Sequence, residues 1–445
     1  MKSENIAAIS TALAPAGVAV IRVSGDNPLI VAQKIFKPLG KVKVENFEPN
    51  KLYVGEISGE NFTDFGMCVF FKAPHSFTGE NSVEFHCHGG TAIVKGILKK
   101  ILSSGARLAT NGEFTKRAFI NGKLSLSSCE GLIEMINAES IGQVRAGYSL
   151  YREKLTREVE DLQEQLISAL SHIEASIDFP EEGLEEVSLN NVNKILQEIV
   201  SRLNQMLNTY SSGRVVKNGV NVAIVGKPNT GKSSILNALL NYDKAIVSDI
   251  AGTTRDAVEG GIEYKGVKFN FTDTAGIRES SDKIEAIGVS TSKKILGGSD
   301  LIVFILDGGN ITNDDEEIYN LVKDKNTLVV INKTDKPYKK DDRAEIYVSA
   351  TENSNINELK EKIFQKTIGN GLDLNGNFLC EERHYNALLQ AKDKLVSALN
   401  NLSVVPLDLI AIDIKDSWDS MGEISGKTAT EDIINEIFSR FCVGK

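Results

Sequence analysis

Three hydrophobic patterns follow one another along the 445-residue chain. Up to about residue 118, short apolar segments such as VAVIRVSG and MCVFFKAP alternate with short helical stretches, which predicts an α/β unit. The pattern then becomes helical, and apolar residues recur every three or four positions along one face, at Leu155, Val159, Leu162, Leu166, Leu170, Ile173 and Ile177. Because this repeat ends at DFPEEG, it favours a helix in a bundle core over an extended coiled coil.

A block of strands alternating with helices interrupts the helical pattern. The linker NTYSSGRVVKNG opens this block and TIGNGLDLNGN closes it, after which helical spacing resumes at Leu388, Leu395, Leu399 and Leu402. The simplest architecture is multidomain, α/β plus all-α, with one α/β domain inserted into a helical domain. The predicted boundaries are residues 1–118 for the N-terminal α/β domain, 119–214 and 372–445 for the two segments of a discontinuous helical bundle, and 215–371 for the inserted domain.

Composition narrows the class of protein. Apolar residues make up 41% of the chain, which suffices for several buried cores. No apolar run is long enough to cross a membrane, and MKSENIAAIS resembles no targeting sequence, so we expect a cytoplasmic protein without a membrane partner. The five cysteines are scattered without CxxC spacing, which favours reduced thiols over disulfides or a zinc site. With a net charge of −10, contact with nucleic acid requires a local basic patch or a partner's surface.

The inserted block contains a phosphate-binding loop. After the apolar strand VNVAIVG, the segment GKPNTGKSS fits the pattern G-x-x-x-x-G-K-[ST]. Its glycines let backbone N–H groups surround phosphate oxygens, Lys232 neutralises the β- and γ-phosphates, and the Ser233 hydroxyl binds Mg²⁺. The predicted nucleotide contacts in this loop are Gly226, Asn229, Thr230, Gly231, Lys232, Ser233 and Ser234.

Three further motifs follow, each at the end of a strand pattern. VKFNFTDTAG places Asp273 near the Mg²⁺ ion and leaves Gly276 free to approach a γ-phosphate. NTLVVINKTD ends in Asn332, Lys333 and Asp335, and the Asp335 carboxylate can accept both N–H donors of guanine, a pairing that adenine lacks. IYVSA supplies a closing loop over the base through Ser349 and Ala350. The set predicts a Ras-like P-loop domain that binds GTP.

The residues predicted to promote GTP hydrolysis differ from those of switch GTPases. Ile277 follows the D-x-x-G glycine where switch GTPases carry a glutamine that orients water. Glu285 could hold the water instead, although a glutamate in so charged a segment could equally belong to a solvated helix face. Thr254 is the natural second hydroxyl ligand for Mg²⁺. Asn229 offers a carbonyl oxygen where a monovalent cation could replace an arginine finger, whose loss costs on the order of 10³–10⁵ in rate.

Together these residues resemble a known family. GKPNTGKSS, DIAGTTRD, DTAG and NKTD are similar to the potassium-activated GTPases. With HCHGG, FTKRAFINGKLSL, IDFPEE and the terminal FCVGK, the whole chain resembles the MnmE (TrmE) family of tRNA modification GTPases.

The resemblance implies a homodimer formed through N-terminal domains and a GTPase that requires K⁺. It also implies a hetero-oligomer with the flavoprotein MnmG (GidA), which brings FAD and NADH. The two proteins would install a carboxymethylaminomethyl or aminomethyl group on C5 of the wobble uridine of certain tRNAs, using a one-carbon unit from 5-formyl- or 5,10-methylene-tetrahydrofolate. The implied K⁺ ligands are the Asn229 side chain and the carbonyls of Ser248, Ile250 and Thr253, with Glu285 orienting water.

The resemblance also implies a folate site in the N-terminal domain. Its residues are Arg22 in VIRVSG, Glu84 in SVEFHCHGG, Lys123 in INGKLSL, and Lys445. A carboxylate suits the amidine edge of a pterin, and cations suit the glutamate tail. The first loop, STALAPAGVAV, departs from the family's P-P-G-x-G run. A metal site at His86-Cys87-His88 is disfavoured, because on a strand the cysteine faces away from both histidines.

Cys442 lies three residues before the end of the chain. We expect Thr428 and Glu431 to form a capping box and Ile433, Ile434, Ile437, Phe438 and Phe441 to anchor the following helix, after which Gly444 lets the chain leave it. The thiol would act as a nucleophile or relay in transferring the one-carbon unit, or would be a buried core cysteine. A ribosome-assembly or regulatory GTPase without covalent tRNA chemistry is the alternative function.

Overall fold

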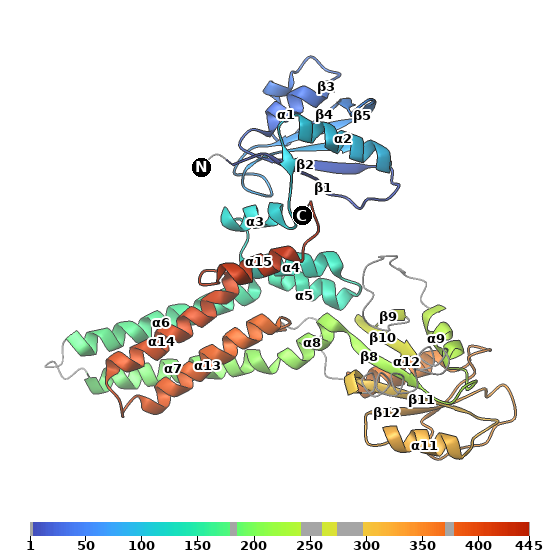
Figure 1. Ribbon diagram of the computed structural model, residues 1–445. Helices are drawn as coiled ribbons and strands as arrows, with labels where there is room; N and C mark the ends of the chain where they lie inside the picture. The colour runs from blue at the N-terminus through green and yellow to red at the C-terminus, as the bar shows by residue number, and fades with distance from the viewer. Residues whose placement is uncertain (1–2, 179–184, 242–259, 274–296, 370–377, 445) are drawn as a thin grey trace, which may run out of the picture. The chain divides into compact units, whose positions relative to one another are not determined.

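The structure is a computed structural model that describes residues 3–178, 185–241, 260–273, 297–369 and 378–444 (Figure 1). The chain divides into two compact units. The first comprises Met1–Ile136, Gly147–Leu203 and Asn386–Lys445, and the second comprises Asn137–Ala146 and Asn204–Tyr385. Gly276, Ser248, Ile250, Thr253, Thr254, Glu285 and Lys445, all named from the sequence, lie outside the described residues.

The N-terminal part of the first unit is a sheet with helices on one face (Figure 1). Its strands are β1 (Ile6–Ile9), β2 (Ala19–Gly25), β3 (Phe36–Pro38), β4 (Leu52–Ser58), β5 (Thr63–Phe71), β6 (Asn81–Cys87) and β7 (Arg107–Leu108), in the spatial order β3-β4-β5-β6-β2-β1-β7. The helices α1 (Pro28–Ile35) and α2 (Thr91–Ser103) cover one face, and η1 (Val44–Asn46) is a single 3₁₀ turn. The α/β prediction for this region is confirmed.

Alternation along the strands separates the two faces of this sheet. Ile21 and Val23 of β2, and Val83 and Phe85 of β6, point into the core beneath α1 and α2. The residues between them, such as Arg22 and Glu84, therefore point to the opposite face. Cys87 is buried in the core while His86 lies on the opposite face with Glu84, as the strand pattern predicts. For His88 the expectation of a strand position is wrong, because β6 ends at Cys87 and the His88 ring binds Asp64 of β5.

The helical part of the first unit is built from segments far apart in the sequence. Its helices are α3 (Glu113–Ile120), α4 (Leu126–Asn137), α5 (Ile141–Tyr151), α6 (Lys154–Asp178), α7 (Glu185–Asn208), α13 (Glu382–Asn401), α14 (Leu407–Ser425) and α15 (Glu431–Ser439), of which α4, α5, α7 and α13 continue into the second unit. The predicted apolar stripe of α6 is buried at Val159, Leu162, Leu166 and Ile173, whereas Ile177, near the helix end, is exposed.

Helices α6 and α14 pack together although more than 200 residues separate them (Figure 1). Gln163 in α6 is buried, and its Nε2 donates to the backbone oxygen of Trp418 in α14 over 2.8 Å. Residues beyond the inserted block therefore complete the bundle that begins before it.

The second unit has a six-stranded sheet in the order β13-β12-β11-β8-β10-β9. The strands are β8 (Val220–Val225), β9 (Gly260–Tyr264), β10 (Val267–Asp273), β11 (Leu301–Asp307), β12 (Thr327–Asn332) and β13 (Ile346–Tyr347), and the helices α8 (Tyr210–Asn218), α9 (Lys232–Asn241), α11 (Asn313–Val322) and α12 (Ile356–Thr367). All neighbours are parallel except β9, which pairs antiparallel with β10. Apolar clusters on both faces explain why β11 is almost wholly apolar.

One expectation for the C-terminal helix requires correction. The N-cap of α15 is Thr430, whose hydroxyl accepts from the Ile433 N–H at 3.5 Å, so the capping box at Thr428 and Glu431 is wrong. The Thr428 hydroxyl instead donates to the Asp419 carbonyl over 2.6 Å, which ties it to α14. The apolar anchors are confirmed, since Ile437, Phe438 and Phe441 are buried with Ile433 and Ile434 packed beside them.

The interpretation of Cys442 as core material is also wrong, because its side chain is exposed while the other four cysteines are buried. Within the described ranges, no helix has both the length and the apolar character needed to cross a membrane.

Candidate functional site

The phosphate-binding loop lies between β8 and α9 in the second unit. The Lys232 ammonium is buried and donates to the carbonyls of Gly226 at 3.0 Å and Lys227 at 2.8 Å, so the loop curls around it. Gly231 has a φ of 91°, a conformation that glycine adopts without strain. The loop opens onto the N-terminus of α9, where backbone N–H groups and the helix dipole favour an anion.

Two of the residues predicted to surround Mg²⁺, Ser233 and Asp273, lie together at this loop. The Ser233 hydroxyl donates to the Asp273 carboxylate over 3.2 Å, and Asp273 ends β10, the parallel neighbour of β8. A hydroxyl and a carboxylate at this separation are hard oxygen ligands of the kind that Mg²⁺ prefers. The residues present therefore fit a magnesium ion.

The predicted base-binding motif converges on the same loop. Asn332 donates from Nδ2 to the Thr230 carbonyl over 2.9 Å, and its Oδ1 accepts from the Ala350 N–H at 3.2 Å. The Ser349 hydroxyl donates to Asp335 over 2.7 Å, and this bond lowers the pKa of the Asp335 carboxyl. An ionised carboxylate at this place can accept the two guanine donors.

Lys333 links this motif to the phosphate-binding loop and to one residue that the sequence did not reveal, Asp307. Its ammonium donates to the Asn229 carbonyl at 2.6 Å and to Asp307 at 2.7 Å. Burial would raise the pKa of Asp307, but the hydrogen bond from Lys333 outweighs it and the pKa is lowered. The signal that could have revealed Asp307 is an acidic residue closing the apolar strand LIVFILD.

Lys227 tethers the start of the loop to α11. Its Nζ lies 2.7 Å from the fully buried Asp315 carboxylate and 2.7 Å from the Thr312 hydroxyl. Asp315 also accepts from the Thr312 N–H in a capping box. The helix cap therefore fixes the loop, a link that no local pattern in the sequence predicts.

A second cluster lies on the face of the N-terminal sheet opposite α1 and α2. Arg22 and Glu84 pair directly across β2 and β6, and Arg22 Nε donates to Glu84 Oε1 over 2.8 Å. The guanidinium carbon lies 5.2 Å from the centroid of the Phe77 ring and 5.8 Å from that of Phe114. Burial would raise the pKa of Glu84, but the contact with His86 and the charge of Arg22 outweigh burial, so the pKa is lowered and the carboxyl stays ionised.

The loop before β6 brings Lys123 near this cluster. Lys123 Nζ donates to the Pro74 carbonyl over 3.1 Å, and Asn121 donates to the Thr78 carbonyl over 2.8 Å. Phe77 of the same loop lies beside Arg22. Three of the four predicted folate residues thus approach one loop and two adjacent strands.

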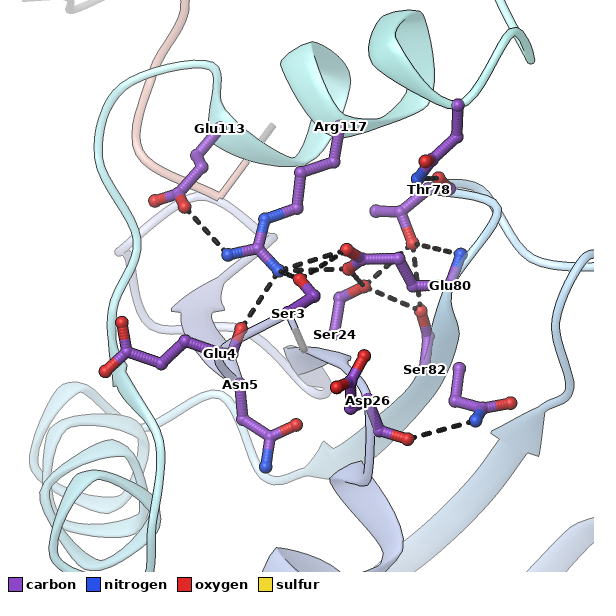
Figure 2. Close-up of polar contacts among 12 residues, drawn as sticks. Ser3, Glu4, Asn5, Ser24, Asp26, Thr78, Glu80, Ser82, Glu113 and Arg117 are labelled. Carbon is purple, nitrogen blue, oxygen red and sulfur yellow. Dashed lines mark hydrogen bonds and ion pairs between the residues drawn. The ribbon is translucent and has the colours of Figure 1, made fainter. Parts of the chain in front are cut away.

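A network of polar side chains fixes this loop (Figure 2). Glu80 accepts from the hydroxyls of Ser3 at 2.6 Å and Ser24 at 2.9 Å. Arg117 of α3 lies 3.0 Å from Glu80 and also donates to Glu113 over 3.0 Å (Figure 2). The chain start, β2, the loop and α3 are thereby joined.

The C-terminal tail lies against the N-terminal sheet of the same chain. Val443 forms an antiparallel bridge with Asn111, and the Ser10 hydroxyl donates to the Gly444 carbonyl over 3.2 Å. Helix α15 ends at Ser439, so Gly444 is needed for docking rather than for leaving the helix. Its φ is 102°, and a Cβ there would collide with the Ile9 carbonyl. The chain end is therefore held at β1, the strand beside β2.

The class of protein follows from the second unit, whose parallel sheet, phosphate-binding loop and guanine-type motif define a P-loop GTPase domain. Residues 5–123 match the family described as "GTP-binding protein TrmE N-terminus", and residues 126–442 match "MnmE helical domain".

Full-length relatives agree with these matches. The chain is 38% identical over 460 residues to the "tRNA modification GTPase MnmE" of Thermoanaerobacter pseudethanolicus, covering 100% of both chains. The protein of the same name from Caldicellulosiruptor saccharolyticus is 38% identical over 456 residues, again covering 100% of both. That of Clostridioides difficile is 37% identical over 455 residues, covering 99% of both. The chain belongs to the MnmE family of tRNA modification GTPases.

Proposed function

We propose that this chain hydrolyses GTP and, with a flavoprotein partner, installs a carboxymethylaminomethyl or aminomethyl group on C5 of the wobble uridine of certain tRNAs. The observation that carries the GTPase part is the convergence of Lys232, Ser233, Asp273 and Asp335 at one end of the sheet. The tRNA chemistry rests on family membership over the whole chain. The partner, MnmG (GidA), brings FAD and NADH, and both proteins act in the cytoplasm.

We assign these roles to four segments. Residues 1–118 bind folate and form the dimer, 215–371 bind and hydrolyse GTP, and 119–214 with 372–445 form the helical domain. This division is supported by the position of the two sites, since the anion site and the Arg22–Glu84 pair belong to separate compact units.

In the GTPase domain, Lys232 neutralises the β- and γ-phosphates while Asp335 selects guanine. Ser233, Asp273 and Thr254 hold Mg²⁺, which neutralises charge on the phosphates when bound. Gly276 approaches the γ-phosphate and Glu285 orients the attacking water.

Potassium activates hydrolysis in this proposal. The ion is bound by the side chain of Asn229 and the carbonyls of Ser248, Ile250 and Thr253. Support comes from the position of Asn229, whose exposed side chain stands on the phosphate loop while its carbonyl is engaged by Lys333. The Asn229→Ala variant should lose any difference in rate between KCl and NaCl buffers; a persisting difference would exclude this ligand.

The one-carbon donor is a 5-formyl- or 5,10-methylene-tetrahydrofolate bound by Glu84, Arg22, Lys123 and Lys445. The ionised Glu84 carboxylate suits the two adjacent N–H donors of the pterin ring. The tail docked through Val443 and Gly444 brings the exposed Cys442 thiol next to the same domain, which supports Cys442 as a nucleophile or relay. Cys442→Ser should abolish tRNA modification and retain GTP hydrolysis; normal modification would make the thiol structural.

The homodimer forms through the face of the N-terminal sheet opposite α1 and α2. Leu52, Val54 and Phe65 on this face are each about half exposed, and one apolar sheet face left in water is unfavourable. A second copy would cover it. The Phe65→Glu variant should change the mass measured by light scattering from dimer to monomer, whereas an unchanged mass would place the interface elsewhere.

The experiment that tests the whole function is mass spectrometry of nucleosides from total tRNA. A strain lacking the gene is compared with the same strain carrying it on a plasmid. Loss and return of C5-aminomethyl-type wobble uridines would support the proposal. Unchanged nucleosides would leave a ribosome-assembly or regulatory GTPase.

A further inference from the structure

His86 lies beside the Arg22–Glu84 pair, and it is not among the residues proposed to bind folate. It stands two residues after Glu84 on β6 and opposite Val20 on β2, so register places it on the same face as Glu84 and Arg22. Its side chain is 24% exposed, but its Nε2 atom is shielded from solvent and makes no regular hydrogen bond in the described part of the chain.

The atom that Nε2 faces is the second oxygen of Glu84. The distance from His86 Nε2 to Glu84 Oε2 is 3.5 Å, while Glu84 Oε1 is bound by Arg22 at 2.8 Å. The carboxylate is thus contacted on one oxygen by a permanent cation and on the other by an imidazole. Such an arrangement fixes the plane of the carboxylate and leaves its remaining lone pairs for an incoming pair of N–H donors.

The other charged groups around the imidazole are few. On β6, Glu84 shares its face, and on β2 there is Arg22. His88 lies beyond the end of β6 and is bound by Asp64 of β5 at 2.7 Å. The residue opposite His86 on β5 is Met67, which carries no charge. The charge on His86 therefore acts chiefly on Glu84, because His88 already has its own carboxylate.

We infer that His86 is a positioning residue for Glu84 that holds the carboxylate in the orientation needed by a cyclic amidine ligand, and that its protonation makes ligand binding pH-dependent. This inference rests on the proposed folate function. A protonated imidazole donates to Oε2 and supports the ionised carboxylate, whereas a neutral ring can present a lone pair to it. Affinity should therefore be higher at low pH, where the imidazole is protonated, than at high pH, where it is neutral.

The experiment measures the dissociation constant of 5-formyltetrahydrofolate for the full-length chain by calorimetry between pH 5.5 and 8. His86→Leu should weaken binding on the order of tenfold at pH 6, because one support of the carboxylate is lost. His86→Gln should restore affinity, since its amide donates to Oε2 at every pH, and should flatten the pH profile. His88→Gln is the matched control and should keep the wild-type profile.

The outcomes separate this inference from the folate proposal. If the wild-type chain does not bind 5-formyltetrahydrofolate, both the folate site and the role of His86 are overturned. If the wild type binds and His86→Leu binds equally well, only the role of His86 is overturned. The same holds if His86→Gln keeps the wild-type pH profile, or if His88→Gln removes it. Melting temperatures of all variants show whether each is folded.

Discussion

The contact between Arg117 and Glu80 allows a stability prediction whose magnitude follows from burial. The two side chains are only 12% and 15% exposed, and Arg117 also donates to Ser3 and to the Glu4 carbonyl. Breaking a buried ion pair from one side costs about 3–5 kcal/mol. In the Arg117→Met variant, Glu80 still accepts hydrogen bonds from two hydroxyls and Glu113 is still paired with Arg107. We therefore expect a loss of stability at the lower end of this range, about 3 kcal/mol.

The matched control is Arg107→Met. Arg107 contacts the same carboxylate, Glu113, at 2.6 Å, but it is 40% exposed. Solvent-exposed ion pairs contribute about 0–1 kcal/mol, so this variant should have a small effect. The two substitutions remove the same type of side chain, and the one removed in the control is the more exposed of the two.

Hydrogen exchange measures the effect locally, which avoids assuming that a multidomain chain unfolds in one step. In Arg117→Met, the amides of residues 76–82 and 113–121 should exchange roughly 100-fold faster, which corresponds to about 3 kcal/mol. In Arg107→Met the same amides should accelerate by no more than about 5-fold. If both variants exchanged alike, the buried pair would not be what holds α3 to the loop.

Three further predictions concern single groups. Burial would raise the pKa of Glu113, but hydrogen bonds from Arg107 and the Thr110 N–H outweigh it and lower the pKa to about 2, so this carboxylate stabilises the fold above its usual pKa of 4.5. That stability should be lost as the pH falls from 4.5 towards 2, and Glu113→Gln should reduce the acid sensitivity seen in thermal melts. Iodoacetamide at pH 8 should alkylate exposed Cys442 in the folded chain, whereas Cys87, whose pKa burial raises to about 11, should react only in denaturant; equal rates by peptide mass spectrometry would contradict this. Asp335→Asn should weaken GTP binding about 100-fold or more through loss of charge-assisted bonds, as measured with a fluorescent GTP analogue, and unchanged affinity would exclude Asp335 as the guanine acceptor.

Sequence reasoning succeeded where the signal is local. The alternation in β6 gave the correct opposite faces for His86 and Cys87, and the apolar spacing gave most of the buried stripe of α6. It failed at the cap of α15, where Thr428 and Thr430 are both plausible N-caps and the Thr428 hydroxyl is taken by Asp419 of another helix. A competing tertiary hydrogen bond decided between two local choices of similar energy.

The sequence by itself determined the class of the nucleotide site and the order of the elements. A phosphate-binding loop is contiguous, and its glycines, Lys232 and Ser233 are fixed in number and spacing by backbone geometry. Only the tertiary structure decided which distant residues meet. Glu84 lies 62 residues from Arg22, Arg117 lies 37 from Glu80, and Gly444 lies 434 from Ser10. These contacts depend on strand register and on how α3 and the tail dock. Such packing is set by the sum of many weak interactions across the fold, and no segment encodes it alone.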